Sequence, residues 1–359
     1  MKNLIKNIYK NLIKFIFLKI NGKILLPNKK VKNLKVSEIN FINRDNIKKY
    51  KYKLYEIING KVFTNYVENV SVISDNFLIK NASFQQINGF LKNSENEVLK
   101  SGIPKFLKKV NGSVAVLTQG ASGHHNYAHW LLDIIPKMKL ISNVYSLNKI
   151  DYFYFTRLNS FQKQTLKLLG VESHKFIDSN YERYLMADKL IAVSHPYNFN
   201  KSFFISQSKI PKWIIRYLRK EFLKKVNNPK KKIKKIFIDR SDSKNTHCKL
   251  INNEEIKKFL IKNNYKCIKL SELTFAEQVS VFKNCNKVIA PHGAGLTNIA
   301  FCTKDTKIIE IIPKDNSNKL FKRISEINNL NYKSIYLNKI KGNLNGDIYL
   351  DLEILKKFI

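Results

Sequence analysis

The stretch KVIAPHGAGLTNIAFC, residues 287–302, joins two apolar runs through a turn that contains two glycines. The first run, residues 287–290, predicts a buried strand, and the second, residues 296–302, predicts a helix. Gly293 and Gly295 have no Cβ atom, so backbone N–H groups in this turn can approach an anion, and the helix N-terminus adds partial positive charge. A tight strand-to-helix turn would by itself also account for both glycines.

Strands and helices alternate on both sides of this stretch, which favours parallel sheets covered by helices. Residues 30–110 read instead as short strands and turns, and the polar, charged residues 227–235 predict a hinge. We therefore predict an α/β protein with two Rossmann-like domains facing a cleft, residues 21–225 and 226–359, the last helix being able to pack back on the first domain. The expected strands are 113–120, 151–156, 189–195, 236–239, 265–270 and 307–312, and the expected helices are 160–170, 211–226, 252–263 and 274–285.

The net charge of the chain is +38, which suggests nucleic acid, an anionic membrane or a negatively charged substrate as partner. A biased base composition of the coding DNA is an alternative explanation, because the sequence is crowded with lysine, asparagine and isoleucine. Only seven of the 65 cationic residues are arginines, whereas proteins that read nucleic-acid sequence rely on arginine for bidentate contacts. We expect no specific nucleic-acid partner.

Four cysteines lie far apart and form no CxxC pair, which is typical of reduced thiols in a cytoplasmic protein. No apolar run is long enough to span a bilayer, and the first residues lack the continuous apolar core of a signal peptide. Residues 1–20 instead predict a basic amphipathic helix, with lysines at four-residue spacing opposite an apolar side. This helix either lies on the inner face of the cytoplasmic membrane, as a peripheral anchor, or docks on the protein's own core.

Three charged residues in the second half are candidates for ligand contacts. Arg240 ends an expected strand and Lys249 precedes the next helix, so the two could clamp a diphosphate or could be ordinary surface charges. Glu310 interrupts the apolar strand 307–312, where a buried carboxylate needs a partner. That partner could be a ribose hydroxyl of a ligand or a lysine in the core.

The stretch NYAHWLLD, residues 126–133, carries a third group of candidates. At about 100° per helical residue, Asn126, His129 and Asp133 fall within about 60° of one another, and the apolar residues gather on the opposite side. This polar face is expected to look away from the core. It could supply a general base, bind zinc together with His125, or be a solvated helix face.

Taken together, these stretches resemble glycosyltransferase family 61, the type found in bacterial capsular polysaccharide biosynthesis. The matching motifs are NYAHWLLD, FIDRSDSK with KLINNEE, FAEQVSVF and PHGAGLTNIAF, in that order over roughly residues 110–315. FIDR stands where the family more often has ISR, and Lys249 stands where arginine is common.

The resemblance implies a GT-B fold in which the second domain holds a nucleotide-sugar donor and the first holds a glycan or lipid-linked glycan acceptor. It implies an inverting hexosyl- or pentosyltransferase for surface polysaccharides such as capsule or lipopolysaccharide, with a UDP-sugar as preferred donor and no obligatory cofactor or metal. Asp133 is the first candidate for the base and His129 the second, with His124, His125 and Asn126 on the acceptor side. The expected donor contacts are Arg240, Lys249, His292, Gly293, Ala294, Gly295, Leu296, Thr297, Asn298 and Glu310.

Two other classes of function remain open at this point. A metal-dependent hydrolase could use His125, His129 and Asp133 as ligands. A noncatalytic protein could bind glycans or nucleic acid through its positive charge, and its nucleic-acid binding would then depend steeply on salt.

Overall fold

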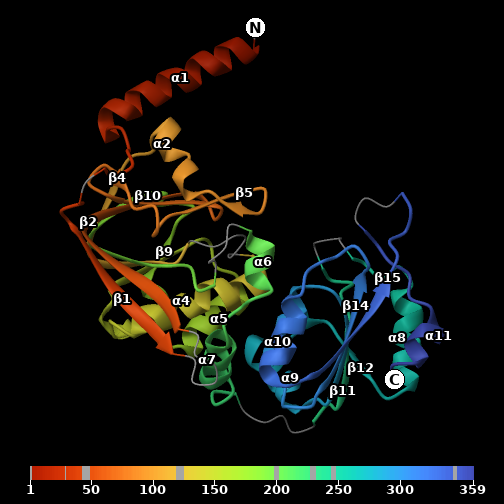
Figure 1. Cartoon of the computed structure of the whole chain (residues 1–359). Helices are drawn as coiled ribbons and strands as arrows, with labels where there is room; N and C mark the ends of the chain where they lie inside the picture. Colours follow the sequence, from red (N-terminus) through yellow and green to blue (C-terminus); the bar gives the residue numbers. More distant parts are fainter. Residues whose placement is uncertain are drawn as a thin grey trace. The chain divides into compact units, whose positions relative to one another are not determined.

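The computed structural model describes residues 2–28, 30–42, 49–118, 125–197, 202–226, 232–243, 248–342 and 346–359. The contacts within the chain divide it into two units, Met1–Ser206 and Gln207–Ile359. Each unit has its own sheet, so the expected α/β class is confirmed (Figure 1).

The boundary between the units lies earlier in the chain than the sequence suggested. Helix α7 (Lys212–Phe222) packs on the second unit, because the ring of Phe222 lies edge-on against Phe275 at 4.8 Å and against Phe301 at 6.2 Å. The guanidinium of Arg219, on the same helix, donates hydrogen bonds to the carbonyls of Ala300 at 2.8 Å and Cys302 at 2.6 Å.

The first unit is built on a mixed ten-stranded sheet in the order β6-β5-β3-β2-β10-β7-β8-β9, with β1 beside β2 and β4 beside β3. Strands β10, β7, β8 and β9 are parallel, whereas β10 pairs antiparallel with β2, so only part of this sheet resembles a Rossmann fold. The strands are β1 (Leu34–Ile42), β2 (Lys49–Tyr66), β3 (Asn69–Ser74), β4 (Phe77–Leu78), β5 (Phe84–Ile87), β6 (Phe90–Leu91), β7 (Lys108–Val116), β8 (Tyr152–Phe155), β9 (Phe176–Asp178) and β10 (Tyr184–Val193).

Strand β2 is 18 residues long, so the expectation that residues 30–110 hold only short strands is wrong there. The pair Asn59-Gly60, which reads as a turn, lies inside the strand. Asn59 has a left-handed φ of 51°, and Gly60 pairs with Ala187 of β10. A Cβ atom on Gly60 would lie 2.6 Å from Cβ of Leu190, so the glycine lets β2 and β10 approach each other.

The helices of the first unit begin with α1, which is helical from Lys2 to Asn21 as the sequence predicts. None of the helices in the described ranges combines the length and apolar character needed to cross a membrane. The others are α2 (Val98–Ser101), α3 (Tyr127–His129), α4 (Ile135–Ser142), α5 (Ser160–Leu168) and α6 (Phe203–Gln207), with short turns of 3-10 helix at Asn93–Glu95, Leu147–Lys149 and Ser173–Lys175.

The second unit has a parallel five-stranded sheet in the order β12-β11-β13-β14-β15, as the alternation of strands and helices predicts. The chain reverses its winding direction between β11 and β13, and open α/β sheets bind ligands at the carboxyl ends of strands at such a point. The strands are β11 (Lys235–Ile238), β12 (Lys266–Ile268), β13 (Lys287–Pro291), β14 (Lys307–Pro313) and β15 (Asn331–Leu337). The helices besides α7 are α8 (Asn253–Lys262), α9 (Phe275–Asn284), α10 (Leu320–Asn328) and α11 (Leu352–Lys356), with 3-10 turns η5 (Leu270–Glu272) and η6 (Ala294–Phe301).

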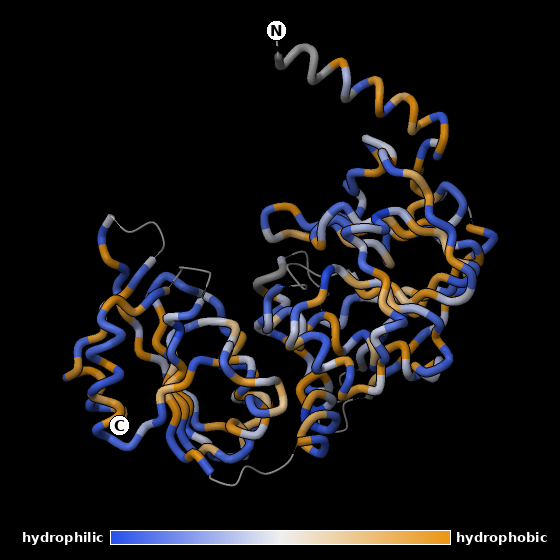
Figure 2. Tube along the Cα trace, turned by 180° about the vertical axis from the view of Figure 1, so that it is seen from behind, coloured by the Kyte–Doolittle hydropathy of each residue, from blue (hydrophilic) through white to orange (hydrophobic). Residues whose placement is uncertain are grey.

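The apolar side chains of β11, β13 and β14 form the core of this unit, and Figure 2 shows the hydrophobic colour concentrated along its strands. Phe237, Ile289 and Ile309 contribute from the strands, and Leu355 of α11 packs into the same core. The last helix therefore belongs to the second unit.

Candidate functional site

At the carboxyl end of β11, Asp239 fixes the turn that follows. Its side chain is 2% exposed and accepts hydrogen bonds from the backbone N of Ser241 at 2.9 Å and from Nδ2 of Asn253 at 3.0 Å, while Nζ of Lys257 lies 3.1 Å away. Burial alone would raise the pKa of Asp239, but these hydrogen bonds outweigh it and hold the pKa below its usual range. The turn carrying Arg240 is thereby tied to helix α8.

Arg240 joins the loop after β11 to the loop after β13. Its Nη1 donates a hydrogen bond to the carbonyl of His292, and its Nη2 lies 3.5 Å from Oγ of Ser243. A Cβ atom on Gly293 would lie 2.6 Å from Cζ of Arg240, so any larger residue would require the guanidinium to move. Burial lowers the pKa of Arg240, and the group remains a cation at neutral pH.

A chain of hydrogen-bonded side chains holds the imidazole of His292 in place. Its Nδ1 bonds to Oε1 of Glu310, and Oε2 of the same carboxylate accepts a hydrogen bond from the hydroxyl of Tyr332. Oγ of Ser334 donates to that hydroxyl at 2.9 Å, and the ring of Phe321 lies 5.3 Å from the imidazole. Glu310 is 1% exposed, and its partners are His292 and Tyr332, not a core lysine. Its effect on a ligand would therefore act through His292.

The rest of the glycine loop packs against η5 and α9. A Cβ atom on Gly295 would lie 2.6 Å from Cδ1 of Leu270, and Nδ2 of Asn298 donates to Oε1 of Gln278 at 3.0 Å. Only Ala294 and Gly295 in this loop are partly exposed. Leu296, Thr297 and Asn298 are fully buried, backbone included, so this arrangement leaves no surface on them for a ligand to contact.

Lys249 lies on the exposed surface, unlike Arg240. Its backbone is fixed, because its N donates to Oδ1 of Asp347 at 3.2 Å and its carbonyl accepts from the N of Ile348 at 2.9 Å. Burial raises the pKa of the neighbouring Cys248 thiol, and the charge of Arg240 acts against that rise, so this segment lies close to Arg240. The structure therefore brings Arg240, His292 and Glu310 together and leaves the Lys249 side chain in solvent.

In the first unit, Asn126 begins the helix that carries the other candidates. Its Oδ1 accepts hydrogen bonds from the backbone N of Ala128 at 2.9 Å and of His129 at 3.2 Å, so it is an N-cap. Nδ1 of His129 lies 2.8 Å from Oδ2 of Asp133. These two side chains form the pair that the helical spacing predicts.

The expectation that this polar face looks away from the core is wrong for Asp133. Its side chain has no exposed surface, whereas the side chain of His129 is 14% exposed. The helix widens to a π-turn over Trp130–Ile134, in which the N–H of Ile135 bonds to the carbonyl of Trp130, and continues through Pro136 into α4. The wider turn accommodates a proline that would otherwise clash with the carbonyl four residues earlier.

Three residues that sequence reasoning missed complete the surroundings of Asp133. The hydroxyl of Tyr197 donates to Oδ1 of Asp133, and Nε2 of His195 lies 3.9 Å from Oδ2. Burial lowers the pKa of His195 to about 3, so its imidazole is neutral at pH 7. Burial likewise lowers the pKa of Lys137 to about 7, with the charge of Asp133 acting against that shift. Tyr197 and His195 follow β10, so no sequence pattern linked them to Asp133. Lys137 lies one helical turn after Asp133, and its spacing could have indicated the contact.

The zinc triad is not assembled in this structure. Nδ1 of His125 lies 3.1 Å from Nδ2 of Asn159, and Nδ1 of His129 is engaged by Asp133. Within the described ranges, no three His, Cys, Asp or Glu side chains are grouped so that they could hold a metal ion. His124 lies outside the described residues.

The pair in the first unit is suited to proton transfer. Oδ2 of Asp133 accepts the hydrogen bond from Nδ1 of His129, so Nδ1 carries the hydrogen. Nε2 is then the basic nitrogen of His129. A carboxylate that fixes an imidazole in this way also stabilises the imidazolium that forms when a proton is taken up. In the second unit, Arg240 and the loop of residues 292–295 place a cation and small residues at the carboxyl ends of the strands. This is the edge at which open α/β sheets bind ligands.

Comparison with known proteins adds one family. A family model described as Glycosyltransferase 61 matches residues 127–309, about half of the chain. The match runs from the start of the Asn126-capped helix through Arg240 and the glycine loop into β14. No curated protein matches the chain.

Proposed function

The chain belongs to the glycosyltransferase 61 family and is a glycosyltransferase; we propose that it transfers a hexose or pentose from a nucleotide-diphosphate sugar to a glycan or lipid-linked glycan. A UDP-sugar is the preferred donor, and capsule or lipopolysaccharide is the product class. Inversion at the anomeric carbon and a GT-B arrangement belong to the same proposal.

The donor half of this proposal rests on one observation, the contact of Arg240 with the carbonyl of His292 and with Gly293. It places a guanidinium across the two loops at the switch point of a parallel sheet, where phosphate groups are bound in folds of this type. Arginine can contact two phosphate oxygens at once, and partly exposed Ala294 and Gly295 leave backbone near the same edge. These residues would offset the charge of the leaving diphosphate, without an obligatory metal.

The acceptor half assigns proton removal to His129, with Asp133 as its positioning residue. The order suggested by the sequence is thereby reversed, since Asp133 has no exposed surface and both its oxygens already accept hydrogen bonds. In the transfer, Nε2 of His129 takes the proton of the acceptor hydroxyl, and the acceptor oxygen bonds to the anomeric carbon. The bond from that carbon to the diphosphate breaks, and its electron pair leaves with the nucleotide. Attack from the face opposite the leaving group inverts the carbon.

We also propose that the protein works in the cytoplasm. All four cysteines are free, including the buried Cys285 and Cys302 with their Sγ atoms 4.0 Å apart. Free thiols fit a reducing compartment.

A panel of nucleotide-diphosphate sugars, tested with the purified chain and candidate glycan acceptors, examines the function directly. Release of the nucleotide together with a product whose mass has increased by one sugar is the expected result. Consumption of acceptor alone, abolished by a chelator, would point to the hydrolase instead. Binding of glycan with no nucleotide release for any donor would contradict the assignment of a transfer reaction to these residues.

A further inference from the structure

Among the described side chains of α1, those of the last turn attach the helix to the first unit. Nδ2 of Asn21 donates to the carbonyls of Ile103 at 2.7 Å and Lys105 at 3.0 Å, and the ring of Phe17 lies edge-on to Phe106 at 5.0 Å. The rest of the helix extends away from the sheet (Figure 1). The described side chains between Ile8 and Ile16 are exposed or half-buried, so this part of α1 does not dock on the core.

The undocked part of α1 carries an exposed apolar stripe, which we call the α1 ridge: Ile8, Leu12, Phe15 and Ile16, exposed by 60%, 55%, 59% and 45%. These residues fall on one side of the helix at the usual spacing, and Figure 2 shows the mixed hydropathy of this segment. Lys14 is exposed, and helical spacing places it away from the ridge. A contiguous apolar surface of this kind indicates a binding partner.

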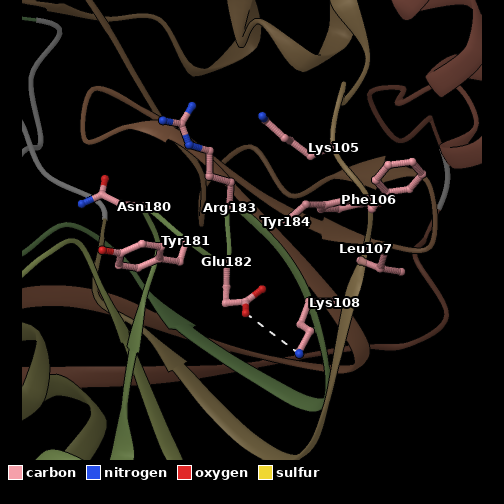
Figure 3. Close-up of a pocket in the computed structure, with 9 residues that line it drawn as sticks. All are labelled: Lys105, Phe106, Leu107, Lys108, Asn180, Tyr181, Glu182, Arg183 and Tyr184. Carbon is pink, nitrogen blue, oxygen red and sulfur yellow. Dashed lines mark ion pairs between the residues drawn. The ribbon is translucent and has the colours of Figure 1, made fainter.

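A basic cavity of about 360 Å³, shown in Figure 3, includes in its lining Lys105 and Phe106, which contact the last turn of α1. Three cations line it, Lys105, Lys108 and Arg183, against one carboxylate, Glu182, whose Oε1 is 4.0 Å from Nζ of Lys108. The cavity therefore keeps an excess of positive charge. Two aromatic rings that also line it are largely exposed, Phe106 by 75% and Tyr181 by 80%.

Lys105 and Phe106 belong to the wall of the cavity and also anchor the last turn of α1, so the cavity lies beside the attachment point of the helix that carries the ridge. The cavity lies away from the pair of His129 and Asp133. The cavity contains Tyr184, where β10 begins, whereas the residues around Asp133 follow the other end of that strand. At about 3.3 Å per residue, the two ends of β10 are about 30 Å apart.

We propose that the α1 ridge and this basic cavity together bind the surface of an anionic lipid bilayer. Exposed aliphatic and aromatic side chains enter the boundary between headgroups and acyl chains, as amphipathic helices do. The cations of the cavity meet lipid phosphates, and Phe106 and Tyr181 lie at the level of the headgroups. Nucleic acid would satisfy the cations but would leave the aliphatic ridge without a partner.

The test is co-sedimentation of the full chain with vesicles of phosphatidylcholine, alone or mixed with phosphatidylglycerol. We expect binding to the mixed vesicles, release by high salt, and little binding to phosphatidylcholine alone. The ridge variant Ile8→Gln/Leu12→Gln/Phe15→Gln and the cavity variant Lys105→Gln/Lys108→Gln/Arg183→Gln should each bind about tenfold to a hundredfold less. Thermal melting of both variants should match the unaltered chain, since the substituted side chains are solvent-exposed or line an open cavity.

Matched controls remove the same kinds of groups from the second unit. Ile251→Gln/Ile261→Gln/Tyr336→Gln takes away three exposed apolar side chains, and Lys258→Gln/Lys262→Gln/Lys304→Gln takes away three exposed charges. Both should bind within twofold of the unaltered chain. Equal losses in variants and controls would mean that total charge or hydrophobicity, not this surface, drives binding, and would overturn the proposal. A ridge variant that turns a dimer into a monomer while vesicle binding is unchanged would assign the ridge to a second copy, which also overturns it.

Discussion

Nδ1 of His129 lies 2.8 Å from Oδ2 of Asp133, and of the two side chains only His129 reaches the surface. Asp133 accepts hydrogen bonds on both oxygens in the core, and the imidazole beside it is partly exposed. We therefore propose Asp133 as the positioning group and His129 as the base, roles that the helical spacing alone left open.

His129→Ala should lower turnover by about 10²–10⁴, the usual contribution of a positioned base, and should leave donor affinity nearly unchanged. Added imidazole should restore part of the rate, because it supplies the missing base. Single-turnover rates and calorimetric nucleotide affinities measure both effects.

Asp133→Asn should also lower turnover, but imidazole should not rescue it, because the base is still present and only its orientation is disturbed. The affinity for donor should again be unchanged. Rescue of Asp133→Asn together with a nearly normal rate for His129→Ala would return the role of base to Asp133.

Arg240→Ala should weaken binding of the donor nucleotide by about tenfold to a hundredfold, since a charge-assisted hydrogen bond is worth about 1.5–3 kcal/mol. Lys249→Ala is the comparison variant, because Lys249 is the second cation that follows β11 and its side chain lies in solvent. We expect it to change affinity by less than threefold, since exposed charges contribute about 0–1 kcal/mol. Titration calorimetry with the nucleotide diphosphate would contradict the donor site if both variants bound normally.

Gly293→Ala should displace the guanidinium of Arg240, because the added Cβ would lie 2.6 Å from its Cζ. We expect nucleotide affinity to fall about as far as in Arg240→Ala. Gly295→Ala is a comparison within the same loop: its Cβ would meet the end of the Leu270 side chain and not the guanidinium, so nucleotide affinity should fall less than in Gly293→Ala.

The double variant Gly293→Ala/Arg240→Ala tests the same contact through stability. Removing the guanidinium makes room for the methyl group, so the double variant should be less destabilised than the sum of the single variants. Urea unfolding of all four proteins gives the coupling energy. Strict additivity would mean that the two residues do not press on each other.

Lys137 predicts a particular dependence of stability on pH. Burial lowers its pKa in the folded protein to about 7, whereas the unfolded chain has the ordinary value of about 10.4. Between these values the unfolded chain binds more protons, so this group makes the folded state more stable as pH rises from 7 to 10. The free energy of unfolding of the unaltered chain, relative to Lys137→Met, should therefore increase over that range. A difference that is constant with pH would show that Lys137 keeps its ordinary pKa.

Local sequence was sufficient to predict the parallel sheet of the second unit and the contact between His129 and Asp133 within one helix. The alternation of apolar strands and amphipathic helices between residues 236 and 312 led to the parallel sheet, because each element buries one face in a period that can be read from the chain. His129 and Asp133 are four residues apart on a helix, so their contact follows from helical geometry. The motifs also carried the resemblance to the family, which the match over residues 127–309 confirms.

What the sequence could not determine depends on residues that are distant along the chain. Tyr197 reaches Asp133 across 64 positions, and Arg240 reaches the carbonyl of His292 across 52. No local period encodes such contacts, since they depend on how strands pair and how helices pack on them. For the same reason, only the tertiary structure decided that Asp133 is buried and that Gly293 makes room for a guanidinium. Pairing between β2 and β10 likewise kept Asn59 and Gly60 inside a strand, where local preference alone predicts a turn.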